Sequence, residues 1–152
     1  MKTKSFLIIF FFVFTTLNGC KRDTSTICDK LLEQGDAGQS LLKGEWKFES
    51  FAYTLNGSTI KYKEKIQKGT LAFNDTTMGV SHTNTIRFLY TLEGKNNIMI
   101  KMKGSTYINP PQEENDVTVA LINSLCYVIK ENKLLIHFTE KDKKNILILT
   151  KK

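Results

Sequence analysis

The sequence predicts a mainly β (α+β) fold, an antiparallel β-sheet with one packed α-helix, placed behind an N-terminal export signal. Two observations predict this fold. From residue 42 onward, apolar residues recur at every second position in short runs separated by turn residues, as in strands with one wet face. One segment near residues 112–125 instead spaces its apolar residues as a helix does.

The first twenty residues have the layout of a cleaved export signal. Two lysines precede an unbroken apolar run, residues 6–14, which is too brief to cross a bilayer. The run leads into Leu17–Cys20, which resembles a bacterial lipobox. We expect residues 1–19 to be a lipoprotein signal peptide and Cys20 to become the lipidated N-terminus. Its acyl chains would anchor the protein in the membrane.

Residues 20–40 are expected to form the lipidated Cys20 and a polar tether that contains Gly35 and Gly38. Lys21 follows the cysteine, in place of the Asp that retains many lipoproteins in the inner membrane. This favours the outer membrane, with the domain facing the periplasm or the cell exterior. The alternative is an ordinary secretory signal in which Cys20 is incidental.

Residues 41–152 are expected to form a single domain that opens with strands. In the first strand, residues 44–53, Trp46 and Phe48 alternate with charged residues. The segment Glu93–Asn97 is short enough to force an antiparallel hairpin, and a meander is the simplest topology. The expected core comprises Trp46, Phe48, Leu71, Phe73, Phe88, Ile100, Leu121, Ile136 and Phe138.

The period of two ends at Asn109-Pro110-Pro111, and a helix is expected to follow. Glu113, Glu114 and Asp116 lie where the positive end of its dipole would be, which explains their charge. The apolar stripe of this helix would pack on the sheet. Three further strands are expected at residues 127–130, 134–139 and 146–150. The last of them is apolar on both faces, so it should be covered on both sides.

The charge of the chain bears on its partners. The formal net charge is +7, and removal of residues 1–19 leaves 20 basic and 15 acidic residues. The basic residues are scattered among strands without an aromatic stacking platform, and export removes the protein from the cytoplasm, so we expect no nucleic-acid partner. A modest positive excess suits a position near anionic headgroups or an acidic cell-wall polymer. The simpler interpretation is that the lysines are solvated and prevent edge-to-edge aggregation.

The order of five motifs resembles that of a known family. The motifs are Leu42–Trp46, Leu71–Phe73, residues 80–84, residues 90–94 and residues 127–136. Together they resemble the META domain, the family of HslJ-like heat-inducible lipoproteins, over about residues 41–151. The resemblance implies a compact, barrel-like antiparallel fold with one helix, no established chemistry, and a link to stress tolerance at the cell envelope.

The chain departs from the family pattern at His82-Thr83, where Gly-Cys is usual. Any role of that cysteine therefore does not carry over. Asn84 is retained, and we expect it to cap neighbouring backbone. A rival resemblance is to lipocalins, since Gly44-Glu45-Trp46 is similar to the Gly-x-Trp motif that closes one end of their barrel. A helix before the last three strands argues against a lipocalin, whose helix follows the eighth strand.

Few residues of the sequence are candidates for a disulfide, a metal site or a catalytic site. Cys28 and Cys126 can pair in an oxidising compartment, or Cys126 can be a small buried residue and Cys28 a free thiol. His82 and His137 lack metal-ligand spacing, and His137 is expected to be satisfied or solvent-facing. No nucleophile motif accompanies either histidine. We therefore expect no enzyme activity, no metal and no cofactor. The favoured function is an envelope interaction module, and the alternative is a lipocalin-like carrier of a small apolar ligand.

Overall fold

The computed structural model describes residues 28–29, 32–33, 35–55, 59–106, 108–140 and 143–152. The predicted signal peptide and lipobox lie outside these residues. Within the described residues, no helix is long and apolar enough to cross a bilayer.

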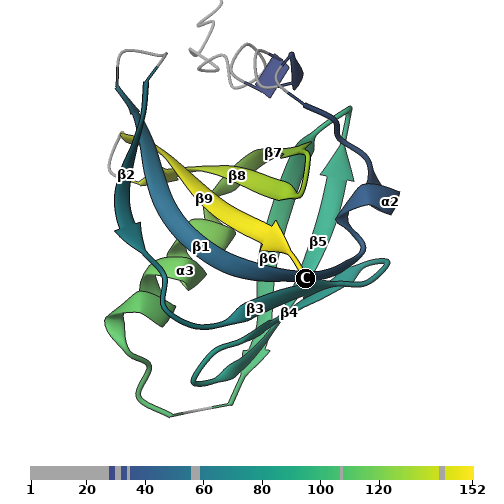
Figure 1. The fold of residues 1–152 in the computed structure, drawn as a ribbon. Helices are drawn as coiled ribbons and strands as arrows, with labels where there is room; N and C mark the ends of the chain where they lie inside the picture. Colours follow the sequence, from purple (N-terminus) through teal and green to yellow (C-terminus); the bar gives the residue numbers. More distant parts are fainter. Residues whose placement is uncertain (1–27, 30–31, 34, 56–58, 107, 141–142) are drawn as a thin grey trace, which may run out of the picture.

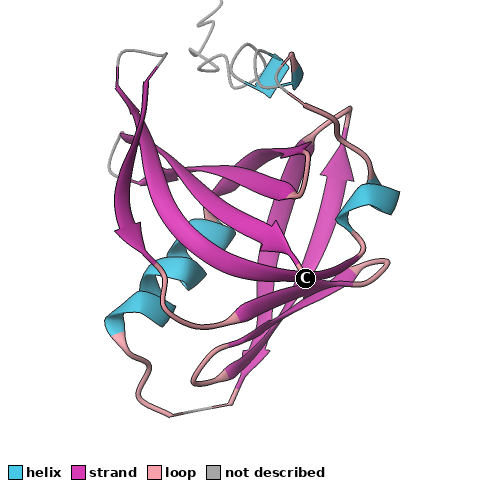
Figure 2. Cartoon of the chain, in the orientation of Figure 1, coloured by secondary structure: helices cyan, strands magenta, loops and turns pink. Residues whose placement is uncertain are grey.

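The described chain forms a nine-stranded antiparallel sheet accompanied by helices (Figures 1 and 2). The helices are α2 (Gln39–Leu42) and α3 (Gln112–Ile122). The strands are β1 (Gly44–Leu55), β2 (Thr59–Lys65), β3 (Thr70–Phe73), β4 (Thr77–Ser81), β5 (Thr85–Glu93), β6 (Asn97–Ser105), β7 (Ser124–Lys130), β8 (Lys133–Glu140) and β9 (Lys143–Lys151). The predicted strands are all present, and most extend further than expected.

The sheet closes on itself as a barrel. Strands β3 to β9 follow one another as a meander, and β1 pairs with β9 over Trp46 to Tyr53. On its other edge, β1 pairs with β3 near its start and with β2 near its end. Strands β2 and β3 therefore share one place beside β1, and the result is an eight-stranded closed antiparallel barrel. The predicted meander and antiparallel hairpin are confirmed.

The barrel interior is filled with large side chains. Trp46, Tyr127, Phe48 and Phe88 are each at most 1% exposed and belong to one apolar cluster with inward residues of the other barrel strands. Every residue of the predicted core is buried. An eight-stranded barrel is just wide enough for side chains to fill it or to hold one small ligand. Here, large side chains occupy the interior.

Helix α3 packs against β6 and β8 (Figure 1). Strands β6 and β7 share a single paired position, Asn97 with Cys126, and α3 precedes β7 in the chain. Its residues Val117, Ala120 and Leu121 are buried in the same cluster as the barrel interior. The helix ends at Ile122 instead of the expected residue 125.

The early end of α3 has a local cause. Residues from 124 onward join β7, where they pair with β8, so the last two positions of the predicted apolar stripe belong to a strand. The backbone carbonyl of Asn123 accepts a hydrogen bond from Thr139 of β8 at 3.2 Å. Tertiary pairing thus overrides the helical spacing of the sequence.

Strand β9 is covered on both faces, as its sequence predicts. Leu147 and Leu149 belong to the interior cluster, whereas Ile146 and Ile148 belong to a separate cluster with Ala52. These four residues of β9 are each at most 3% exposed. His137, which lies opposite Ile146, is also buried, so the solvent-facing alternative for this histidine is wrong.

The segment before the barrel lies against it instead of standing apart. Asp36 pairs with Ile129 of β7 through two backbone hydrogen bonds of 2.7 and 2.8 Å. Cys28 forms a disulfide with Cys126, and the Cys28 carbonyl accepts a hydrogen bond from the Asn96 side chain at 2.8 Å. The expected domain boundary at residue 41 therefore falls within a packed region.

Candidate functional site

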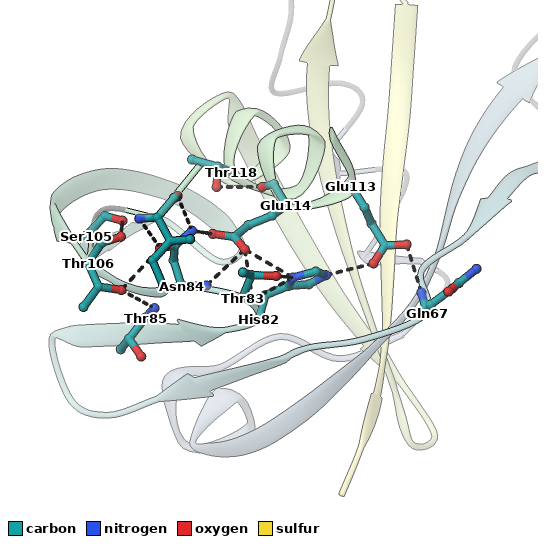
Figure 3. Close-up of polar contacts among 11 residues, drawn as sticks. Gln67, His82, Thr83, Asn84, Thr85, Ser105, Thr106, Glu113, Glu114 and Thr118 are labelled. Atoms are coloured by element: carbon teal, nitrogen blue, oxygen red, sulfur yellow. Dashed lines mark hydrogen bonds and ion pairs between the residues drawn. The ribbon is translucent and has the colours of Figure 1, made fainter. Parts of the chain in front are cut away.

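The densest polar cluster of the described chain surrounds Glu114 at the start of α3. Glu114 is 1% exposed, although it stands in the first turn of a helix whose remaining buried residues are apolar. Its carboxylate faces the turn between β4 and β5, residues 82–84 (Figure 3). We call His82, Asn84, Glu113 and Glu114 the helix clasp, because they join this turn to α3.

Three N–H groups donate to Glu114. The side-chain amide of Asn84 reaches Oε1 at 2.7 Å, and the backbone N–H groups of Thr83 and Asn84 reach Oε2 at 3.0 and 3.1 Å. Both carboxylate oxygens are therefore satisfied within the protein. Hydrogen bonds to an ionised acceptor are about twice as strong as neutral ones, which offsets the cost of burying the charge.

Asn84 is held in a single orientation by the loop after β6. Its Nδ2 donates to the Ile108 carbonyl at 3.0 Å, and its Oδ1 accepts from the Ile108 N–H at 2.9 Å. Asn84 thus binds backbone, as expected, but the backbone is that of Ile108, 24 positions along the chain, and not that of its neighbours. The same amide reaches Glu114, so one side chain joins the turn before β5, the loop after β6 and helix α3.

His82 lies between the two glutamates of the clasp (Figure 3). Its Nε2 is 2.8 Å from Glu113 Oε1, and its Nδ1 is 3.2 Å from Glu114 Oε2. The Thr83 N–H donates to Nδ1 at 2.8 Å. The ring therefore contacts both glutamates and the backbone of Thr83, and the donor and acceptor roles of its two nitrogens depend on the tautomer.

Both glutamates are held in their ionised form. Desolvation favours the neutral acid in each case. Hydrogen bonds from His82 and from backbone N–H groups, including that of Gln67, nevertheless hold the pKa of Glu113 below its usual range. Hydrogen bonds from Asn84 and Thr83 do the same for the pKa of Glu114. A carboxylate held in this way is a poor proton donor near neutral pH.

The arrangement of the helix clasp favours a structural role over a catalytic one. Its polar atoms bind one another and the neighbouring backbone, so their hydrogen bonding is already satisfied. Among the described residues, no three histidine, cysteine or acidic side chains are grouped so as to hold a metal ion. The clasp holds α3 in place beside the barrel.

The helix dipole, which the sequence analysis used to explain Glu113, Glu114 and Asp116, is only part of the reason for these acidic residues. A position in the first turn of α3 suits negative charge, but the dipole alone does not explain why Glu114 is buried. Its partners lie some thirty positions earlier in the chain. Asn84 was the one available signal in the sequence, and it pointed to a cap and not to its acidic partner.

No family model and no curated protein matches this sequence. Among solved structures, the chain is similar to a DUF4847 family protein from Bacteroides vulgatus, with a TM-score of 0.57 and 19% sequence identity. The match covers 72% of this chain and 92% of that protein. At this identity, the likeness shows the barrel fold alone.

Proposed function

We propose that the protein is a non-catalytic module of the bacterial cell envelope, held in the outer membrane by lipid on Cys20, which binds or supports another envelope component. The observation that carries this proposal is the filled barrel. Trp46, Phe48, Phe88 and Tyr127 occupy its interior, where a carrier would need a cavity of several hundred Å³. A barrel of this kind offers its outer surface to partners.

The META resemblance belongs to this proposal. Helix α3 stands before the last three strands, and this position supports the resemblance. The satisfied polar atoms of the helix clasp favour a non-catalytic role, because its acids and its histidine are engaged with one another.

The second candidate is a lipocalin-like carrier of a small apolar ligand. The eight-stranded antiparallel barrel favours it, since lipocalins close their strands in the same way. Trp46 belongs to the Gly-x-Trp motif that is similar to that of lipocalins, and its indole N–H donates a hydrogen bond to the Leu42 carbonyl at 2.8 Å. The two candidates differ in whether the interior can accept a ligand.

Two experiments test the proposal. Metabolic labelling with a palmitate analogue should label the wild-type protein and fail on Cys20→Ala, and equal labelling of the two would overturn the lipid anchor. Crosslinking in intact cells should recover an envelope component with the wild type, with Cys20→Ala as the matched control. If no component is recovered, and a fluorescent apolar probe binds at about micromolar affinity and is displaced by lipid extract, the carrier is the better description.

A further inference from the structure

The outer face of β5 and β6 carries positive charge with apolar side chains between. Interior and exterior positions alternate along β5, so that Arg87 and Leu89 point outward, and Met99, Lys101 and Lys103 are exposed on β6. Leu89 lies directly opposite Lys101 in the ladder. We call these five residues the basic face.

The charges of the basic face are not neutralised within the described chain. None of its three cations forms an ion pair with a described carboxylate, and Glu93 is the single acidic residue on the two strands. The opposite wall differs: Lys152 pairs with Glu45 at 3.0 Å, and Lys133 pairs with Glu49 at 3.0 Å. Lysines also stand on β2 and β9, so the positive charge is not confined to β5 and β6. What these two strands offer is three cations that remain available to an anionic partner.

The basic face also has the apolar component that a lipid surface accepts. Leu89 is 41% exposed and Met99 is 45% exposed, and they lie beside charged residues of the same face. Cations attracted to anionic headgroups, with apolar side chains entering the boundary beneath them, are typical of interfacial membrane binding. A nucleic-acid or soluble anionic partner would not require exposed Leu and Met side chains.

The point at which the predicted tether joins the barrel lies next to this face. Cys28 is fixed by its disulfide to Cys126, and Cys126 lies opposite Asn97 at the start of β6. Asn96, in the turn between β5 and β6, donates to the Cys28 carbonyl. The disulfide and this hydrogen bond therefore fix the tether at one end of the β5–β6 hairpin.

The length of chain before Cys28 limits how far the barrel can stand from its anchor. The eight Cα-to-Cα steps from Cys20 to Cys28 span at most about 28 Å when the chain is fully extended. The nine residues of β6 span about 30 Å. A lipid on Cys20 would thus remain within about one hairpin length of Cys28, which is fixed at the end of the β5–β6 hairpin.

We propose that the basic face, Arg87, Leu89, Met99, Lys101 and Lys103, lies on the anionic lipid surface in which Cys20 is anchored. This inference rests on the lipid anchor proposed above, and it adds an orientation. The β5–β6 wall faces the bilayer, and the wall formed by β1 and β9 is left for other partners. The two contacts reinforce each other, because a short tether raises the local concentration of the basic face at the membrane.

Lysine acetylation on vesicles tests the orientation. The lipidated full-length mature protein is reconstituted in vesicles with about 30% phosphatidylglycerol or with phosphatidylcholine alone, and acetylation of each lysine is followed by mass spectrometry. Lys101 and Lys103 should react about threefold more slowly on the anionic vesicles, whereas the exposed Lys47 and Lys130 should not change. About 0.5 M salt should remove the protection. Equal rates for all four lysines, or protection of Lys47 and Lys130 instead, would overturn the proposal.

Charge reversal gives a matched comparison. The patch variant Arg87→Glu/Lys101→Glu/Lys103→Glu and the control variant Lys47→Glu/Lys68→Glu/Lys130→Glu change the net charge equally. Lys95 is exposed in the β5–β6 turn, and it should also react more slowly on anionic vesicles in the wild type. This protection of Lys95 should be lost in the patch variant and kept in the control variant. Loss of protection in both variants would show attraction by net charge alone and overturn a specific face.

The intact mass of the protein purified from membranes separates this inference from the proposed anchor. An acylated mass without protection of Lys101 and Lys103 overturns the orientation and leaves the anchor standing. An unacylated mass overturns the anchor. In that case, a histidine tag in place of residues 1–20, bound to a nickel-chelating lipid, supplies an equivalent attachment, and the same lysine pattern still decides the orientation.

Discussion

Replacement of Glu114 by glutamine probes the helix clasp with almost no change in shape. Both carboxylate oxygens accept hydrogen bonds, Oε1 from the Asn84 amide and Oε2 from the backbone of Thr83 and Asn84. Asn84 cannot turn around, because Ile108 fixes its orientation. The glutamine amide nitrogen would therefore face an N–H donor in either orientation.

The magnitude follows from the groups left without an acceptor. A hydrogen bond to a charged group contributes about 1.5–3 kcal/mol, and an unsatisfied buried donor costs about 1–3 kcal/mol. We expect Glu114→Gln to lower the free energy of unfolding by about 2–4 kcal/mol, a large share of the stability of a small domain. With a typical urea dependence, the unfolding midpoint would fall by about 1–2 M.

The assay is urea unfolding of the disulfide-intact protein, followed by the fluorescence of Trp46. Glu93→Gln is the control, because Glu93 is exposed in the β5–β6 hairpin, and it should change stability by no more than about 0.5 kcal/mol. If the midpoint of Glu114→Gln falls no further than that of Glu93→Gln, the hydrogen bonds of the clasp do not stabilise the fold and the reasoning is refuted.

The pH dependence of the same pair gives a second check. The pKa of Glu114 in the folded protein lies below its ordinary value of 4.5. A lowered folded-state pKa stabilises the fold above pH 4.5, and this stabilisation is lost as the pH falls through the folded-state value. The stability difference between the wild type and Glu114→Gln should therefore shrink on acidification. A difference that grows in acid would contradict the assignment.

Three further predictions concern the barrel and its disulfide. Trp46→Ala should lower the free energy of unfolding by about 3–5 kcal/mol in a urea titration followed by circular dichroism, and a loss as small as that of an exposed lysine would contradict its buried place. Thiol counting on the denatured, unreduced mature protein should find Cys28 and Cys126 oxidised, and two reactive thiols would exclude the disulfide. Gly69→Ala should lower the melting temperature, because φ is +101° at this residue and the new Cβ would lie 3.0 Å from the Phe48 ring. Gly104→Ala is the control, because the space around Gly104 is open. Equal shifts in the melting temperature of the two variants would refute the steric argument.

The sequence was informative wherever a property repeats locally. Alternation placed the strands and the core, since each inward position of a strand is read from its nearest neighbours in the chain. Because Ile146–Leu149 are apolar at every position, the sequence correctly predicted that β9 is covered on both faces. The acidic start of α3 was also visible, and its first residue agrees with the structure.

Contacts between distant segments could not be predicted in this way. The pairing of β1 with β9 joins positions about a hundred residues apart, and no local pattern encodes it. The burial of Glu114 depends on a turn thirty residues earlier, and its acidic side chain resembles that of an ordinary first-turn residue. The end of α3 was misplaced because residues 124–125 fit a helical stripe and also fit a strand, and the partner strand decided between them.

Closure by β1 and β9 constrains when this domain can acquire its structure. Until β9 is available, β1 and β8 each lack a neighbour and would present an open edge. Pairing of distant segments is slow, because the intervening chain must first lose its freedom. A chain that is synthesised from its N-terminus onward would therefore stay incomplete until its final strand is available. During that interval its unpaired edges are the surface through which it would pair with another chain.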